Sequence, residues 1–131
     1  MQQIVDLFRK AGVFYIATAD GDKPRVRPFG FIMEFEGRLY FTTGNKKPVY
    51  AQLKKNPNTE ITAMVSEGEW IRLEGRAVFD GNVSAKRRAF EIFPRFKDLY
   101  QAPENPDFEV FCLDSPSAVL CSMTEPPKKL L

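Results

Sequence analysis

The sequence predicts an α+β fold that is mainly β, an antiparallel, barrel-like arrangement of about six or seven strands with short helices between them. The chain has 131 residues and 44% hydrophobic content, which suits one compact domain with a single core. Short segments rich in β-branched and aromatic residues recur between turn signals. Within 70–80, Ile71 and Leu73 alternate with the charged Arg72 and Glu74, which predicts a strand with one buried face.

The first half of the chain is expected to hold a helix, a pair of hairpins and a second helix. Apolar residues at helical spacing make 1–11 an amphipathic helix that Gly12 ends. Strands at 13–19 and 24–36 form a hairpin, and the turn Glu36-Gly37 leads into a strand at 39–43. Pro48 then opens a short helix that ends before Asn56, because proline suits a first helical position.

The second half continues with strands at 59–66 and 70–80, separated by a glycine turn. We expect Ser84 to cap a helix that runs to Phe93, and Pro94 to start a second helical piece through Tyr100. The proline-rich segment 101–107 is predicted to be a loop. The final strands, 108–113 and 118–123, are joined around Asp114-Ser115-Pro116, and the tail 124–131 is expected to be mobile.

Composition limits the possible functions. Nineteen basic and seventeen acidic residues are interspersed along the chain and leave a net charge of +2, which does not favour nucleic-acid binding. The apolar runs have strand length, so we expect a cytoplasmic protein that does not cross a membrane. Cys112 and Cys121 are predicted to be buried, reduced thiols. The absence of histidine excludes histidine-dependent nucleophiles, the common zinc sites and histidine-ligated haem, so any chemistry should come from a cofactor.

The stretch from Pro24 to Pro57 gathers groups that suit a phosphate. Arg25 and Arg27 lie two residues apart, so on a regular strand they share a face. Lys46 and Lys47 come just before the predicted helix, although a helix dipole disfavours cations at its N-terminus. A bound anion would relieve that repulsion. We therefore predict a pocket for a phosphorylated cofactor, and a flavin mononucleotide (FMN) site would need these cations together with flat apolar walls.

Other interpretations of the same residues remain open. Taken alone, the arginine pair is more typical of solvated strand charges, and threonines such as Thr42 and Thr43 are common at strand ends. Because those threonines should point to opposite faces, only one of their side chains needs to reach a ligand. Trp70 fits stacking beside a flavin and packing at the barrel rim equally well. No side chain stands out as an acid or base, so the sequence names no catalytic residue.

In its order of motifs, the chain resembles the pyridoxamine 5′-phosphate oxidase-like superfamily of split-barrel flavoproteins, particularly its small nitroimidazole-resistance-type and general-stress-type members. The resemblance covers about 14–75 and weakens toward 119. It rests on PxVRPxxF at 24–31, GRLYFTT at 37–43, NKKPVYAQLKKNP at 45–57, and a strand that begins at Trp70 and carries Gly75.

The resemblance implies a six-stranded antiparallel split β-barrel, a homodimer and FMN bound in two clefts at the dimer interface. The loop that holds the phosphate is one residue longer here than in the oxidase, which leaves open whether Lys46 or Lys47 makes the contact. Carried over by position, the cofactor-binding residues are Arg25, Arg27, Pro28, Phe29, Phe41, Thr42, Thr43, Lys46, Lys47 and Trp70.

The C-terminal region departs from the oxidase, which carries there a tryptophan and an Arg-x-His type motif for pyridoxal phosphate. Residues 108–131 contain no Trp, Arg or His. We therefore expect a flavin-dependent reductase or oxidase of another small molecule. One alternative is a small barrel that binds single-stranded nucleic acid through Tyr40, Phe41 and Trp70. Another is a protein that binds a deazaflavin, or that holds flavin without turnover.

Overall fold

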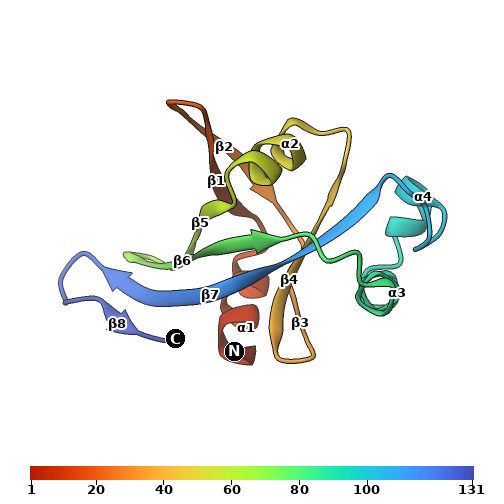
Figure 1. The fold of residues 1–131 in the computed structure, drawn as a ribbon. Helices are drawn as coiled ribbons and strands as arrows, with labels where there is room; N and C mark the ends of the chain where they lie inside the picture. The colour runs from red at the N-terminus through yellow and green to blue at the C-terminus, as the bar shows by residue number, and fades with distance from the viewer.

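A computed structural model describes all residues from Met1 to Leu131 and contains one antiparallel sheet with four short helices around it (Figure 1). Neighbouring strands follow the order β2-β1-β5-β6-β7-β4-β3, and β8 pairs with β7. The elements are α1 (Gln2–Ala11), β1 (Phe14–Asp20), β2 (Lys23–Phe29), β3 (Met33–Phe35), β4 (Arg38–Gly44), α2 (Pro48–Lys55), β5 (Asn58–Ser66), β6 (Glu69–Val78), α3 (Val83–Ile92), α4 (Phe96–Tyr100), β7 (Phe108–Ser122) and β8 (Lys128–Lys129).

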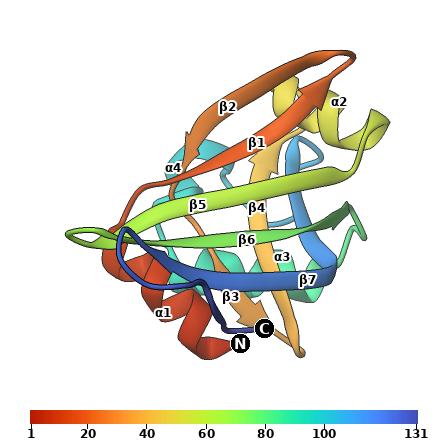
Figure 2. The same cartoon turned by 90° about the vertical axis from the view of Figure 1, so that its left-hand side faces the viewer.

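The sheet curls but does not close, which confirms the predicted split-barrel type of α+β fold. Strands β2 and β3 are the two edges of the sheet, and β2 pairs with β1 alone. Figure 2 shows β2, β1, β5, β6 and β7 side by side, with β3, β4 and the helices α3 and α4 behind them. The sheet has eight strands rather than six, because the two short strands β3 and β8 extend it.

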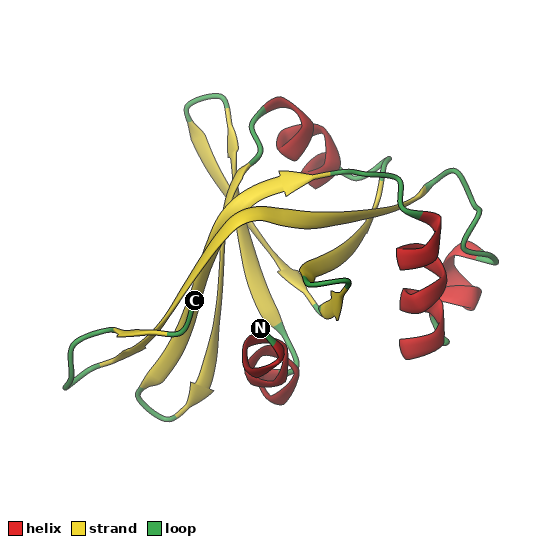
Figure 3. Ribbon diagram, turned by 60° about the horizontal axis from the view of Figure 1, so that its bottom comes forward, coloured by secondary structure: helices red, strands yellow, loops and turns green.

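The core fills the inside of the curled sheet. Helix α1 buries Ile4, Val5 and Phe8 against it, so the predicted amphipathic helix is confirmed. Phe8 and Phe14 meet edge to edge with ring centroids 5.1 Å apart, and Phe41 stacks on Phe111 at 5.3 Å. A second, smaller cluster lies under α3 and α4, which stand apart from α1 and α2 at the periphery of the sheet (Figure 3). None of the four helices has the length and the hydrophobicity that a membrane-spanning helix needs.

The predicted strand at 24–36 is wrong, because the chain leaves the sheet in its middle. Residues 23–29 pair with β1 at one edge, whereas 33–35 pair with β4 near the other edge. One straight strand cannot reach both edges of an open sheet, so 30–32 cross between them. The carbonyl of Ile32 accepts two hydrogen bonds from the Arg9 guanidinium, at 3.3 and 3.0 Å, which fixes this crossing.

The two predicted final strands are one continuous strand, β7. Ser115 and Pro116, expected to turn the chain, form a bulge instead, since Glu74 pairs with Ser117 and Arg76 pairs with Asp114. Gly75 lies opposite the bulge. A Cβ there would come within 3.1 Å of Leu113 Cβ and 3.2 Å of the Asp114 carbonyl, so only glycine fits without a shift.

The start of α3 and the C-terminal tail also differ from expectation. Asn82 caps α3 in place of Ser84, and its side-chain oxygen accepts a hydrogen bond from Ala85 N at 3.0 Å. Residues expected to be mobile form β8, and the carbonyl of Leu131 accepts a hydrogen bond from Ala118 N at 3.1 Å. The tail thereby ends beside the N-terminus (Figures 1 and 2).

Candidate functional site

A cavity of about 780 Å³ opens in the split of the barrel, where β2 and β4 do not pair. Its walls are the inner edge of β2, the end of β4, the first turns of α2 and the segment around α4. The lining residues are Asp20, Arg25, Val26, Arg27, Pro28, Phe29, Gly30, Phe31, Thr42, Thr43, Lys47, Pro48, Val49, Gln52, Phe93, Phe96, Leu99 and Tyr100. The size falls in the range of small-molecule and cofactor sites.

Arg27 is held in a defined position at one wall. Its guanidinium donates hydrogen bonds to Thr18 Oγ1 at 2.8 Å and to Gln52 Oε1 at 2.5 Å. Burial, and then the neighbouring charge of Arg25, lower the pKa of Arg27, but a guanidinium remains charged at neutral pH. Gln52 also accepts a hydrogen bond from Thr18, at 2.6 Å. Sequence reasoning missed Gln52, which the spacing of α2 turns toward the cavity.

Arg25 lies on the same face of β2 as Arg27, as predicted, and forms an exposed ion pair with Asp20 at 3.1 Å. Such a pair contributes little to stability, because water screens both charges. Arg25 can therefore turn to another anion at small cost. The cavity consequently carries two arginines, one held by the protein and one adjustable.

Thr43 is buried, with 5% of its surface exposed, and its Oγ1 is the one buried side-chain oxygen or nitrogen without a hydrogen-bond partner. A buried hydroxyl left unpaired costs roughly 1 to 3 kcal/mol. Thr43 lines the cavity beside Thr42, but its Oγ1 is closed to solvent, so a ligand in the cavity can supply the missing partner only after this side chain turns. Both threonines border the cavity because it surrounds the end of β4.

Helix α2 begins at the same place and has no side-chain cap. Lys47 is its N-cap residue and lines the cavity, and Pro48 at the first helical position has no amide hydrogen. The free amide groups and the dipole at a helix start attract an anion. Lys47 and the uncapped start of α2 therefore line the same cavity as Thr42 and Thr43.

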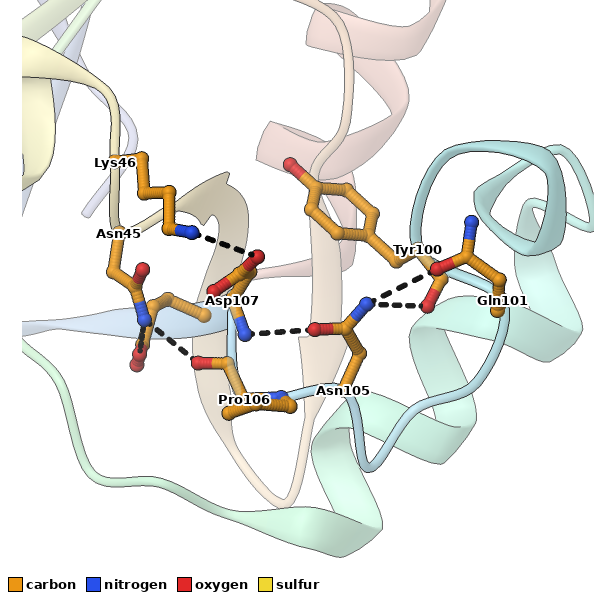
Figure 4. Close-up of polar contacts among 8 residues, drawn as sticks. Asn45, Lys46, Tyr100, Gln101, Asn105, Pro106 and Asp107 are labelled. Atoms are coloured by element: carbon orange, nitrogen blue, oxygen red, sulfur yellow. Dashed lines mark hydrogen bonds and ion pairs between the residues drawn. The ribbon is translucent and has the colours of Figure 1, made fainter.

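Lys46 points elsewhere. Its ammonium lies 3.6 Å from Asp107 Oδ2, and it is absent from the cavity wall (Figure 4). The preceding residue, Asn45, fastens this loop to the start of β7 through hydrogen bonds to the Pro106 carbonyl at 2.7 Å and to Glu109 Oε2 at 2.9 Å. Of the two lysines, the structure brings Lys47 to the cavity.

The opposite wall is apolar and comes from Phe29, Phe31 and the segment 93–100. Phe31 and Phe93 pack edge to edge with Phe96, at 5.2 and 4.8 Å between ring centroids. Leu99 is 65% exposed at this wall. Sequence reasoning predicted Phe29 but missed Phe31 and the members from 93–100, where the only signal is a cluster of apolar residues in and beside a helix of five residues.

Besides Lys46, two further predicted residues lie outside the cavity. Phe41 is fully buried in the core against Phe111, and Trp70 pairs with Met64 and Cys121 on the outward face of the sheet. Tyr40 is 2% exposed, and its hydroxyl donates to Asp80 at 2.5 Å. Because Tyr40 and Phe41 are both buried, these two residues cannot stack on bases in the alternative of a barrel that binds single-stranded nucleic acid.

Comparison with known proteins gives a family match over most of the chain. The family model described as Pyridoxamine 5′-phosphate oxidase matches residues 1–117. A crystal structure of a NimC/NimA family protein from Clostridium acetobutylicum is 36% identical, with a TM-score of 0.91, over 98% of this chain and 90% of that chain. No curated protein matches.

More distant structures share the fold and differ in what their descriptions say they bind. A pyridoxamine 5′-phosphate oxidase-related, FMN binding protein from Nostoc punctiforme is 16% identical, with a TM-score of 0.65, over 96% of this chain and 85% of that chain. A heme storage protein from Vibrio cholerae is also 16% identical, with a TM-score of 0.70, over 92% of each chain.

Proposed function

This chain belongs to the pyridoxamine 5′-phosphate oxidase family, and from that premise we propose that it is a flavoprotein that holds FMN in the cavity between β2 and β4. We further propose that it is an oxidoreductase that acts on a small molecule. The observation that carries the proposal is the uncapped start of α2, where the N-cap residue Lys47 lines the same cavity as Arg25 and Arg27. A phosphate is the ligand that such a set of cations and free helix amides suits.

The other residues of the cavity fit the remaining parts of FMN. Arg27, fixed by Thr18 and Gln52, and the adjustable Arg25 match a phosphate that carries nearly two negative charges. Phe29 and the aromatic wall beside α4 suit the flat isoalloxazine ring. When bound, FMN supplies hydride and electron transfer, while the chain provides position, charge and exclusion of water.

Haem binding is the competing family property, and the residues of the cavity favour FMN. The chain contains no histidine, and neither cysteine lines the cavity. Tyr100 is the one phenol in the wall. An iron ligand would have to be the phenolate, whereas burial, and then the Asp107 charge, raise the pKa of Tyr100. A cavity that carries several cations and offers no ready ligand for haem iron suits a phosphate ester such as FMN better than it suits haem.

We propose a homodimer in which a second copy covers the outward face of the sheet. On that face, Tyr15 is 48% exposed and Met64 is 58% exposed; the strand register places Met64 directly opposite Trp70, and Tyr15 opposite Thr62 on the other side of the same strand as Met64. Val26, also exposed, continues the same face to the rim of the cavity. A partner seated there would bring its own side chains, Trp70 among them, toward the FMN.

The C-terminal residues and the two cysteines bear on the substrate and on the location of the protein. We do not assign vitamin B6 as substrate, because 108–131 lack the Trp, Arg and His of the oxidase. A deazaflavin carries a comparable phosphate and is the second candidate for the same cavity. Both cysteines are free thiols, which supports a cytoplasmic location.

The test is reconstitution. Purified protein is incubated with excess FMN, desalted and examined for flavin absorbance, and the affinity is measured by quenching of FMN fluorescence. We expect a yellow protein that retains FMN, and weaker binding of riboflavin, which lacks the phosphate. A colourless protein that does not quench FMN fluorescence would contradict the proposal. A protein that retains a deazaflavin but not FMN would show that the deazaflavin is its cofactor.

A further inference from the structure

Tyr100 reaches the phosphate end of the cavity from a segment that lies far from Thr43 and Lys47 in the sequence. A Cβ placed on Gly44 would lie 2.9 Å from the Tyr100 hydroxyl oxygen, so this oxygen sits directly against the end of β4. Gly44 follows Thr43, and its carbonyl accepts a hydrogen bond from Lys47 N at 3.1 Å. The hydroxyl therefore lies at the end of β4, beside the loop that leads to α2 and on the face of the strand opposite to the Thr43 side chain.

The Tyr100 hydroxyl has no hydrogen-bond partner in the chain. In Figure 4 the ring rises past Asp107, with its oxygen directed away from Asn105 and not joined to any neighbour. Burial, and then the Asp107 charge, raise the pKa of Tyr100, so the phenol stays protonated at neutral pH and can donate. A donor without an acceptor at the wall of a cavity points to an acceptor on the ligand.

The surrounding structure holds Tyr100 in place. Asn105 Nδ2 donates to the Tyr100 carbonyl at 2.8 Å, and Asn105 Oδ1 accepts from Asp107 N at 2.8 Å (Figure 4). The ring packs on Phe108 with centroids 4.9 Å apart. Asn45 N donates to the Asp107 carbonyl at 3.0 Å, which ties the same segment to the loop before α2. The position of the hydroxyl is thus set before any ligand binds.

We propose that Tyr100 is a specificity-determining residue of this site, whose hydroxyl donates a hydrogen bond to a phosphate oxygen of the bound cofactor. The inference rests on the proposed function, since it takes the phosphate of FMN as the acceptor. It adds a contact from the 94–107 segment to those from β4 and α2. The segment is then part of the binding site and does more than cover the sheet.

The test compares Tyr100→Phe, which removes only the hydroxyl, with the unaltered protein. Because a hydrogen bond to a charged acceptor is lost, FMN affinity should fall by about tenfold, while riboflavin affinity should change by less than about twofold. Tyr50→Phe is the matched control, because Tyr50 lies on α2 against Phe79 and outside the cavity wall. Its FMN affinity should equal that of the unaltered protein.

A second variant tests the position of the hydroxyl independently. In Gly44→Ala, the new methyl group meets the Tyr100 oxygen and should displace it, so FMN affinity falls. In Gly44→Ala/Tyr100→Phe, the clash is gone, and the double variant should bind FMN about as well as Tyr100→Phe alone. Unfolding midpoints measured for each variant without ligand establish that all of them fold.

The outcomes separate the inference from the proposed function. Unchanged FMN affinity in Tyr100→Phe, equal losses for FMN and riboflavin, or additive losses in the double variant would overturn the role of Tyr100 alone. If the unaltered protein does not bind FMN, the proposed function is overturned, and the role of Tyr100 with it.

Discussion

The ammonium of Lys46 lies 3.6 Å from the carboxylate of Asp107, while the next residue, Lys47, lines the cavity at the start of α2. The ion pair is exposed, with 82% of the Lys46 side chain open to solvent, so it contributes little to stability. It nevertheless shows that the two lysines face different partners. Their roles should therefore separate in solution.

Lys47→Gln should weaken FMN binding by at least about tenfold, equivalent to roughly 1.4 kcal/mol, because a charge-assisted contact to the phosphate is lost. Lys46→Gln is the matched control and should change the affinity by less than about threefold. Without ligand, Lys47→Gln should be as stable as the unaltered protein or slightly more stable, since a cation is removed from the positive end of a helix. Fluorescence titration and urea unfolding measure both quantities. Equal effects of the two substitutions on FMN affinity would contradict the assignment.

Thr43→Val should change stability and binding in opposite directions. Valine keeps the shape of threonine and removes a buried hydroxyl that has no partner, so the free protein should gain roughly 1 kcal/mol of stability. FMN affinity should fall by several-fold, because the phosphate loses a donor. Thr59→Val provides the contrast: Thr59 is also buried, but its hydroxyl donates to the Ala17 carbonyl at 2.8 Å, so this variant should lose stability. A loss of stability in Thr43→Val would mean that its hydroxyl is satisfied in the free protein.

Local sequence patterns predicted the fold well where a pattern is compatible with only one kind of structure. Alternation identified β6, and Pro48 marked the start of α2 at the position where the structure has it. The patterns failed where the same residues are compatible with either a turn or a bulge. Ser115-Pro116 form a bulge within β7 because β6 and β4 pair with the two ends of that strand, and these pairings lie far away in the sequence.

The site could be predicted only in part, because contacts between residues far apart in the sequence also form the site. Lys47 was found because a cation is unusual at the start of a helix, and Arg25 and Arg27 were found because they share one face of a strand and match the resemblance. Gln52 and Tyr100 are ordinary residues of their helices, and only the packing of α2 against β1 and of 94–107 against β4 brings them to the cavity. The resemblance placed Phe41 in the site, whereas the inward face of β4 buries it against Phe111.

Tyr40→Phe should destabilise the protein without affecting FMN binding. The hydroxyl of the buried Tyr40 donates to Asp80 at 2.5 Å, and losing this bond should cost roughly 1 to 2 kcal/mol at neutral pH. Burial, and then the hydrogen bond to Asp80, raise the pKa of Tyr40 above its ordinary value.

The pH dependence of this loss has a defined sign. Below the ordinary tyrosine pKa of about 10, both folded and unfolded chains keep the proton, and the difference in stability is constant. Above it, the unfolded chain ionises first, so the contribution of Tyr40 declines and the two proteins approach one another. Urea unfolding at neutral pH and above pH 10 measures this; a gap that widens with pH would contradict the shift of the Tyr40 pKa.

Met64→Glu should convert the proposed dimer to a monomer and weaken FMN binding with it. Met64 is 58% exposed on the outward face of the sheet, directly opposite Trp70, so a carboxylate there would be buried without a partner if a second copy covered the face. Val83→Glu is the control, because Val83 is exposed on α3, away from that face. Light scattering at micromolar concentration should give about twice the chain mass for the unaltered protein and for the control, and a single chain mass for Met64→Glu. If the unaltered protein is a monomer that binds FMN at full strength, the cavity of one chain is sufficient and the dimer is not part of the site.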